Sequence, residues 1–174
     1  MTFALTSGVI AKHAEISPCG RYRYWLAREW DPAAQRLTII MLNPSTADAE
    51  VDDRTIGRCM EFARRDGFGG INVINLFAFR TSSPDKMKAA PDPVGPDNDM
   101  WLIRALKVAS ATGKPIMAAW GVHGEHRARA VYVQGMAQLH GARLVCLGTT
   151  KAGHPKHPLY IPGDQPFIPF GDLA

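Results

Sequence analysis

The sequence predicts an α/β protein: a three-layer α/β/α sandwich with a mostly parallel central sheet and an N-terminal antiparallel edge strand. Short apolar runs, typical of strands buried on both faces, recur along the chain. Segments with helical spacing of apolar residues separate these runs, which implies right-handed crossovers between parallel strands. With 174 residues, 46% of them hydrophobic, the chain can bury one good core. We therefore expect a single domain over residues 1–174.

The N-terminal part predicts the antiparallel edge. Residues 21–30 alternate aromatic and basic side chains, as in a strand with one buried face. The turn-like segment "DPAAQ" then leads into the apolar run 36–42. We expect residues 21–42 to form an antiparallel β-hairpin whose second strand is central in the sheet.

The middle of the chain predicts a helix and then a strand. From Asp53 to Arg65 apolar residues recur at helical spacing, and Gly67 follows where a helix end favours positive φ. The apolar run 71–79 reads as the next strand, buried on both faces.

The second half repeats this pattern. A Pro-rich stretch precedes a helix expected from about Asp97 to Ala111, with acidic residues in its first turn. Another helix is expected from about Glu125 to His140, stopped by Gly141. The tail from Lys151 is rich in Pro and Gly and reads as extended loop. The predicted parallel core comprises strands near 37–42, 71–76, 115–120 and 143–147.

Polar side chains follow the carboxyl ends of these core strands. Open α/β sheets bind ligands in the crevice outside those ends. The side chains are, strand by strand, Asn43, Pro44, Ser45 and Thr46; Asn75, Arg80 and Thr81; Trp120, Gly121 and His123; and Thr149, Lys151, His154 and His157. Asn-Pro-Ser and Trp-Gly also occur in ordinary turns and helix caps. Their convergence from separate strands nevertheless predicts one pocket that includes Asn43, Asn75, Trp120 and His157.

Six motifs resemble a known family over nearly the whole chain. They are "LNPSTADA", "DDRTIGRC", "NLFAFRTSSP", "PVGPDND", "AAWGVHG" and "GHPKHPLY", in family order. They resemble the bacterial and phage family called domain of unknown function 1643. That family has no settled activity, so the resemblance implies no mechanism.

A more distant resemblance is to the uracil-DNA glycosylase superfamily. The matching positions are Asn43-Pro44, Asn75 with Arg80, Trp120-Gly121, and His157-Pro158-Leu159. Two positions depart from the superfamily pattern: Ser45 replaces the usual Gly, and no Ser separates His157 from Pro158. The resemblance implies a uracil-DNA-glycosylase-like fold and an N-glycosidic hydrolase.

Three residues are the candidate catalytic groups. N-glycosidic cleavage needs a held water on one side and hydrogen-bond donors for the departing base on the other. Asn43 can orient the water through its amide oxygen, and His157 can donate to the base. Asp53 can supply a carboxylate, although its position before a helix favours an N-cap.

The other candidate residues would bind the ligand. Phe77 or Phe79 can stack on a base, and Leu159 can act as a wedge where a base leaves its stack. The backbone after Pro44, with the following hydroxyls, can hold a phosphate at a helix N-terminus. The candidate ligand-binding residues are Pro44, Ser45, Thr46, Asn75, Phe77, Arg80, Trp120, Gly121, His123, His154 and Leu159.

Two alternatives stay open, and the sequence does not decide whether the site is catalytic. The first is a non-catalytic domain that binds a nucleotide or nucleic acid. The second is a metal-dependent hydrolase, in which "HGEH" and "HPKH" join Asp52, Asp53 and Glu125 as ligands. Pro residues keep "HPKH" off a regular helix, and the rim is mostly neutral amide and imidazole. We therefore expect no metal and no cofactor.

Composition adds limits on location and partners. A formal net charge of +4 and a pI near 9.1 are compatible with nucleic acid or nucleotide as partner. Cys19, Cys59 and Cys146 lie far apart without C-x-x-C spacing, so we expect reduced thiols. No apolar run approaches the length of a membrane span, and the first 20 residues lack a signal-peptide pattern. These features predict a cytoplasmic protein without a membrane partner.

Overall fold

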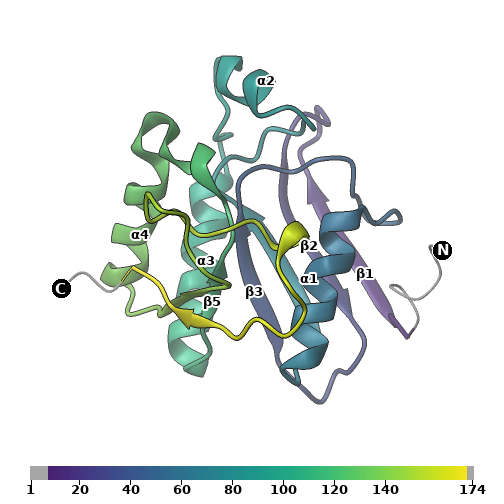
Figure 1. The fold of residues 1–174 in the computed structure, drawn as a ribbon. Helices are drawn as coiled ribbons and strands as arrows, with labels where there is room; N and C mark the ends of the chain where they lie inside the picture. The colour runs from purple at the N-terminus through teal and green to yellow at the C-terminus, as the bar shows by residue number, and fades with distance from the viewer. Residues whose placement is uncertain (1–7, 172–174) are drawn as a thin grey trace.

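The computed structural model describes residues 8–171, which form an α/β protein around a mixed sheet (Figure 1). Its strands are β1 (Ala11–Ile16), β2 (Arg23–Glu29), β3 (Arg36–Met41), β4 (Gly70–Asn75), β5 (Ile116–Ala118), β6 (Leu144–Cys146) and β7 (Ile168–Pro169). Its α-helices are α1 (Arg54–Arg65), α2 (Pro84–Ala89), α3 (Asn98–Thr112) and α4 (Arg129–Leu139).

The sheet has the strand order β1-β2-β4-β3-β5-β6-β7. Strands β4, β3, β5 and β6 are parallel, whereas β1 and β2 extend one edge in antiparallel pairing and β7 extends the other. The predicted parallel core is therefore confirmed, as is an antiparallel N-terminal edge. The outermost strand at that edge is β1, which was not expected from the sequence, and it pairs with β2, the strand expected to lie at the edge.

The predicted hairpin over residues 21–42 is wrong. Strand β2 pairs with β4, and β4 separates it from β3. The connecting segment crosses the start of β4: Trp30 and Asp31 donate their backbone N–H groups to Gly69 O, and Gly69 donates to Gln35 O. A Cβ on Gly69 would stand 2.0 Å from Asp31 O, so only glycine lets the connection lie this close. The turn-like segment therefore connects two strands that are not neighbours, and it passes across the start of β4.

The expected helices form with small changes. Asp53 caps α1, and Gly67 follows its end with φ of 78°. The helix expected near 97–111 is α3. The helix expected over 125–140 is divided: residues 122–128 form 3₁₀ turns, and Arg127 and Ala128 have positive φ before α4 begins. Helical spacing alone does not show this break, because it lies in backbone conformation.

Two short elements were not expected from the sequence. Helix α2 begins at Pro84 after a Ser83 N-cap, in a segment for which no element was predicted. Strand β7 lies in the C-terminal tail, which also contains one 3₁₀ turn at Pro158–Tyr160. The final residues of that tail, 172–174, lie outside the described residues.

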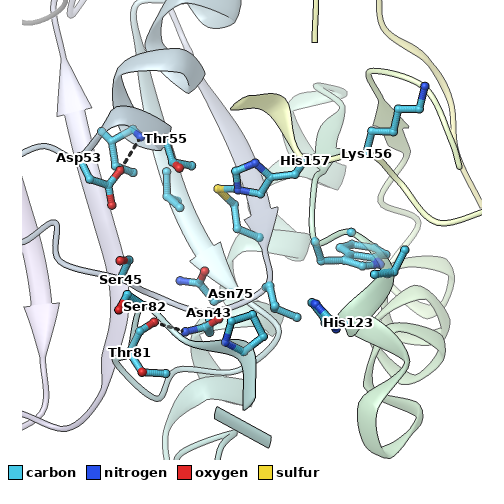
Figure 2. Close-up of a pocket in the computed structure, with 18 of the residues that line it drawn as sticks. Asn43, Ser45, Asp53, Thr55, Asn75, Thr81, Ser82, His123, Lys156 and His157 are labelled. Carbon is cyan, nitrogen blue, oxygen red and sulfur yellow. Dashed lines mark hydrogen bonds between the residues drawn. The ribbon is translucent and has the colours of Figure 1, made fainter. Parts of the chain in front are cut away.

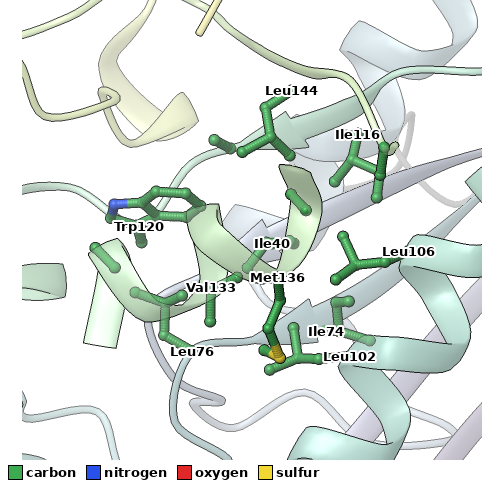
Figure 3. Packing of buried hydrophobic residues seen from close by; sticks show 14 of the residues in the cluster. Ile40, Ile74, Leu76, Leu102, Leu106, Ile116, Trp120, Val133, Met136 and Leu144 are labelled. Carbon is green, nitrogen blue, oxygen red and sulfur yellow. The ribbon is translucent and has the colours of Figure 1, made fainter. Parts of the chain in front are cut away.

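Helices cover both faces of the sheet (Figure 1), and a separate hydrophobic cluster lies beneath each cover. Figure 3 shows the cluster beneath α3 and α4. On one face α1 contributes Ile56 and Phe62, which pack with strand residues such as Ile39. On the other face α3 and α4 pack against Ile40 and its neighbours. Adjacent residues of β3 therefore serve opposite cores, as period-two alternation requires.

No helix in the described part of the chain is long and apolar enough to cross a membrane.

Candidate functional site

A cavity of about 700 Å³ lies outside the carboxyl ends of β3, β4 and β5 (Figure 2). This volume is within the range of small-molecule sites, roughly 300–1,000 Å³. The sequence-predicted residues that line it are Asn43, Ser45, Asp53, Asn75, Trp120, Gly121, His123 and His157. The structure therefore brings together side chains from four separate segments of the chain, and Asn43, Asn75, Trp120 and His157 surround one space.

Six other predicted residues do not line this cavity. Phe77 is fully buried in the core, where it packs on His126. Arg80 donates to Gly20 O at 3.1 Å, and His154 lies 3.1 Å from the Glu125 carboxylate. The remaining three are Pro44, Thr46 and Leu159. Phe79, the other stacking candidate, also lies outside the lining and packs edge-on against Tyr22.

Asn43 follows β3 and is held by its amide nitrogen. Nδ2 donates to Thr81 O at 2.7 Å, to Pro44 O at 3.1 Å and to Phe79 O at 3.4 Å. Because all these partners are carbonyl oxygens, the nitrogen must face them, and this fixes which way the amide is turned. The amide oxygen remains available as an acceptor.

Asn75, the last residue of β4, has an unusual environment. It is 1% exposed and lines the cavity, yet neither Oδ1 nor Nδ2 has a hydrogen-bond partner. Buried polar atoms are nearly always paired, because an unpaired one costs about 1–3 kcal/mol. Beside it, Asn98 donates Nδ2 to the backbone oxygens of Asn75 and Leu76, both at 3.0 Å, which holds this strand end in place. The backbone at Asn75 is therefore held, and its side-chain amide offers an unpaired donor and an unpaired acceptor at the cavity wall.

His157 enters from the segment after β6. Its Nδ1 accepts from the backbone N–H of Leu159 at 3.3 Å, so the neutral ring carries its proton on Nε2. Burial lowers the pKa of His157 below its ordinary value, and the charge of Asp53 opposes this shift only in part. His157 is thus a neutral donor near pH 7.

Asp53 has the structural role that its position predicts and also lines the cavity. Its Oδ1 accepts from Ile56 N at 2.9 Å and so caps α1. The preceding Asp52 turns away and binds the buried Arg28, whose Nε lies 2.7 Å from Asp52 Oδ1. The two adjacent carboxylates therefore differ: one anchors the loop and the other faces the pocket.

The wall built by β5 is aromatic. Trp120 is 2% exposed and packs edge-on against Phe170. Gly121 continues the wall with φ of 68° and ψ of −167°, a conformation essentially confined to glycine. His123 lies on the same side, with Nδ1 3.0 Å from Lys88 Nζ.

Several lining residues were not among the predicted site residues. They are Arg23, Thr55, Ser82, Thr150, Lys156 and Tyr160, together with apolar neighbours; Thr81, named above among the residues at the strand ends, also lines the cavity. Lys156 lies within the "GHPKHPLY" motif and Thr81 follows the second strand end, so their positions signal the rim. Arg23 gives no such signal, because it lies at the start of β2, far along the chain from every core strand end.

The segment that carries His157 and Tyr160 is tied to α1. Arg58 donates to Ile161 O, and Arg65 donates to Gly163 O at 2.9 Å and to Gln165 O at 2.5 Å. Two arginines of α1 therefore hold the C-terminal segment that forms one wall of the cavity.

Among residues 8–171, no three His, Cys, Asp or Glu side chains form a group that could hold a metal ion. The "HGEH" and "HPKH" motifs meet only through the contact of His154 with Glu125.

Comparison with known families gives one match. The family described as "Protein of unknown function (DUF1643)" matches residues 23–159, from the start of β2 to the segment after His157. No curated protein and no solved structure matches the chain.

Proposed function

The chain belongs to the DUF1643 family, whose description names no activity, and from the pocket itself we propose that it binds a nucleobase-containing ligand and acts on it. The observation that carries this proposal is Asn75, a buried amide with both polar atoms unpaired at the wall of a large cavity.

An asparagine amide presents one donor and one acceptor side by side. A planar nucleobase edge offers the complementary pair, and bidentate bonds between asparagine and a base follow from this geometry. Such a ligand would satisfy both unpaired atoms of Asn75 at once. The buried Trp120 and the imidazoles of His123 and His157 line the same cavity, and such aromatic and hydrogen-bonding groups suit a planar heterocycle.

The reaction that this pocket suits best is metal-independent N-glycosidic hydrolysis of the uracil-DNA glycosylase type. Asn43 supports the proposal because its fixed amide leaves the oxygen free to hold a water. The neutral His157 supports it by offering Nε2–H to a base that gains negative charge as it departs. The resemblance in motif order and a parallel core between helices agree with this class, but a fold does not determine a reaction.

A binding domain without catalysis is the second candidate, and Asp53 favours it. An asparagine cannot act as a strong base. The carboxylate that could act as the base, Asp53, already accepts a hydrogen bond as the N-cap of α1. Under this alternative the same residues recognise a nucleotide or nucleic acid and release it unchanged.

The test separates binding from turnover. Purified protein is incubated with single- and double-stranded DNA that carries uracil, mismatches or modified pyrimidines, and with free nucleosides, each with and without chelator. We expect base release that survives chelator and disappears in Asn43→Ala while ligand binding remains. Retained binding without release from any substrate would favour the binding domain, and release that chelator abolishes and zinc or manganese restores would favour a metal hydrolase.

Asn75→Ala tests the recognition step. We expect binding to weaken by about tenfold or more, since two hydrogen bonds to the base are lost. The matched control is Asn72→Ala, because Asn72 lies on the same strand but binds Trp25 and Arg36 outside this cavity. Equal binding by wild type and Asn75→Ala would contradict the proposal.

A further inference from the structure

Arg23 is a buried cation at the wall of the cavity. Arg23 is 3% exposed, and it lines the same cavity as Asn75 and Asp53. In a regular strand the Arg23 side chain would point to the other face of the sheet. Arg23 and Leu26 are three positions apart, so regular alternation would send their side chains to opposite faces.

A β-bulge explains the direction of Arg23. In the pairing of β1 with β2, Glu15 lies opposite Trp25 and Ile16 lies opposite Arg23, so Tyr24 has no partner. The extra residue shifts the alternation, and Arg23 reaches Ala47 O on the α1 face, where Leu26 also packs. Bulges commonly redirect a side chain next to a functional site.

The guanidinium of Arg23 is incompletely paired. Nη1 donates to Ala47 O at 2.6 Å, but Nε is buried and has no partner. Within residues 8–171, no carboxylate lies close enough to form an ion pair with it. The two acidic groups that act on it from further away, Asp48 and Asp53, accept hydrogen bonds from backbone N–H groups instead.

A second arginine increases the positive charge here. Arg80 lies near enough to repel Arg23, and its Nε is likewise buried without a partner. Burial lowers the pKa of Arg23 to about 10, so the group remains protonated at neutral pH. A buried charge without a counter-ion is costly, and a bound anion would offset that cost.

We infer that the end of the cavity at Arg23 binds a phosphate group of the ligand, which makes the ligand a nucleotide or a nucleic acid strand instead of a free base or nucleoside. Hydroxyls of Ser45 and Thr81 line the cavity as further phosphate donors, and the exposed Lys156 adds positive charge at its other side (Figure 2). Asp53 is the one acidic side chain among the described lining residues. This inference rests on the proposed function for the identity of the base.

The test compares each of the common nucleosides with its 5′-monophosphate by calorimetric titration of the full chain. We expect the monophosphate to bind at least about tenfold more tightly, the scale of one charge-assisted hydrogen bond. Arg23→Gln should abolish this difference and leave nucleoside affinity unchanged. Arg104→Gln, which removes an exposed arginine outside the cavity, should preserve it.

Further arms identify the source of the phosphate and guard against misfolding. Short single-stranded DNA is titrated beside the mononucleotides: tighter binding of DNA assigns the site to a phosphodiester, and tighter binding of mononucleotide assigns it to a free nucleotide. Arg23→Lys keeps the charge and should retain a preference for phosphate. If Arg23→Gln does not fold, this variant and the wild-type comparison decide the question.

The outcomes separate this inference from the proposed function. Equal affinity of wild type for nucleosides and monophosphates overturns the phosphate site and leaves base recognition standing. Inorganic phosphate is the probe for the opposite case: if it raises the Tm of wild type but not of Arg23→Gln, while no base or nucleoside binds, the phosphate site holds and base recognition fails.

Discussion

At the scale of single residues, Arg28 determines where the pocket loop lies. Its side chain is fully buried, and it donates to the Asp52 carboxylate and to Asp48 O at 2.5 Å. These contacts hold both ends of the turn at residues 48–52, which lies within the segment that connects β3 with α1. Asp53 faces the cavity because Asp52 is held in the opposite direction. A buried ion pair thus positions a candidate catalytic carboxylate without touching the cavity.

Asp52→Asn should destabilise the protein strongly. The substitution keeps the shape of the side chain but leaves the Arg28 charge without its counter-ion in a buried site, which costs about 3 kcal/mol or more. Urea denaturation measures the free energy of unfolding. The control is Glu29→Gln, whose partner Arg36 is partly exposed, so a change below about 1 kcal/mol is expected. Equal effects of both variants would show that Arg28 is not dependent on Asp52.

His157 should make stability fall on acidification. Burial lowers its pKa in the folded protein below the unfolded value of about 6.5. The unfolded chain therefore takes up the proton first, so this contribution to stability is fully present above pH 6.5 and is lost as the pH falls below it. In His157→Asn, whose amide oxygen can still accept from Leu159, the free energy of unfolding should fall less between pH 7 and pH 5. Parallel curves for the two proteins would contradict the burial of a neutral imidazole.

At the scale of elements, the ends of strands and the turns after them carry the site, and their backbone conformations are specific. The sequence motifs predict which strand ends meet, and eight of the predicted residues line the cavity. Arg23 could not be predicted this way, because a bulge at Tyr24 changes which face it occupies. Leu159 was predicted as a ligand-binding residue from the motif resemblance alone. The chain forms a 3₁₀ turn at Pro158–Tyr160, and Tyr160 lines the cavity instead of Leu159.

Gly121→Ala should destabilise the wall that β5 builds. Nothing lies within 4 Å of the added Cβ, so the effect comes from backbone strain at φ of 68° and ψ of −167°, about 1–3 kcal/mol. Gly135→Ala is the matched control: its Cβ also meets nothing within 4 Å, but Gly135 lies within α4. There alanine should stabilise by about 0.5–1 kcal/mol. Thermal unfolding should move in opposite directions, and shifts of the same sign would refute the explanation.

At the scale of the whole molecule, the parallel core and the placement of helices follow from apolar runs and helical spacing, but the strand order does not. A buried strand shows that it has neighbours without showing which ones. The insertion of β4 between β2 and β3 depends on Gly69, whose missing side chain lets the connecting segment pass over it. Strands β1 and β7 were not predicted because these edge strands are partly or fully exposed and lack a continuous apolar run.

The two hydrophobic clusters should unfold together, because the same strands contribute to both. Ile39 belongs to the cluster under α1 and Ile40 to the cluster under α3 and α4, and both are fully buried. Losing either cluster exposes β3 on one face and removes support for the other. Ile39→Val and Ile40→Val should therefore each lower the free energy of unfolding by about 1 kcal/mol. Each should also lower the urea midpoint of a single transition that both clusters share. Methyl NMR signals of Met60 and Met136, one from each cluster, report the two sides during urea denaturation. Coincident curves in both variants are expected, and a variant that shifts only its own methionine would show two units that unfold separately.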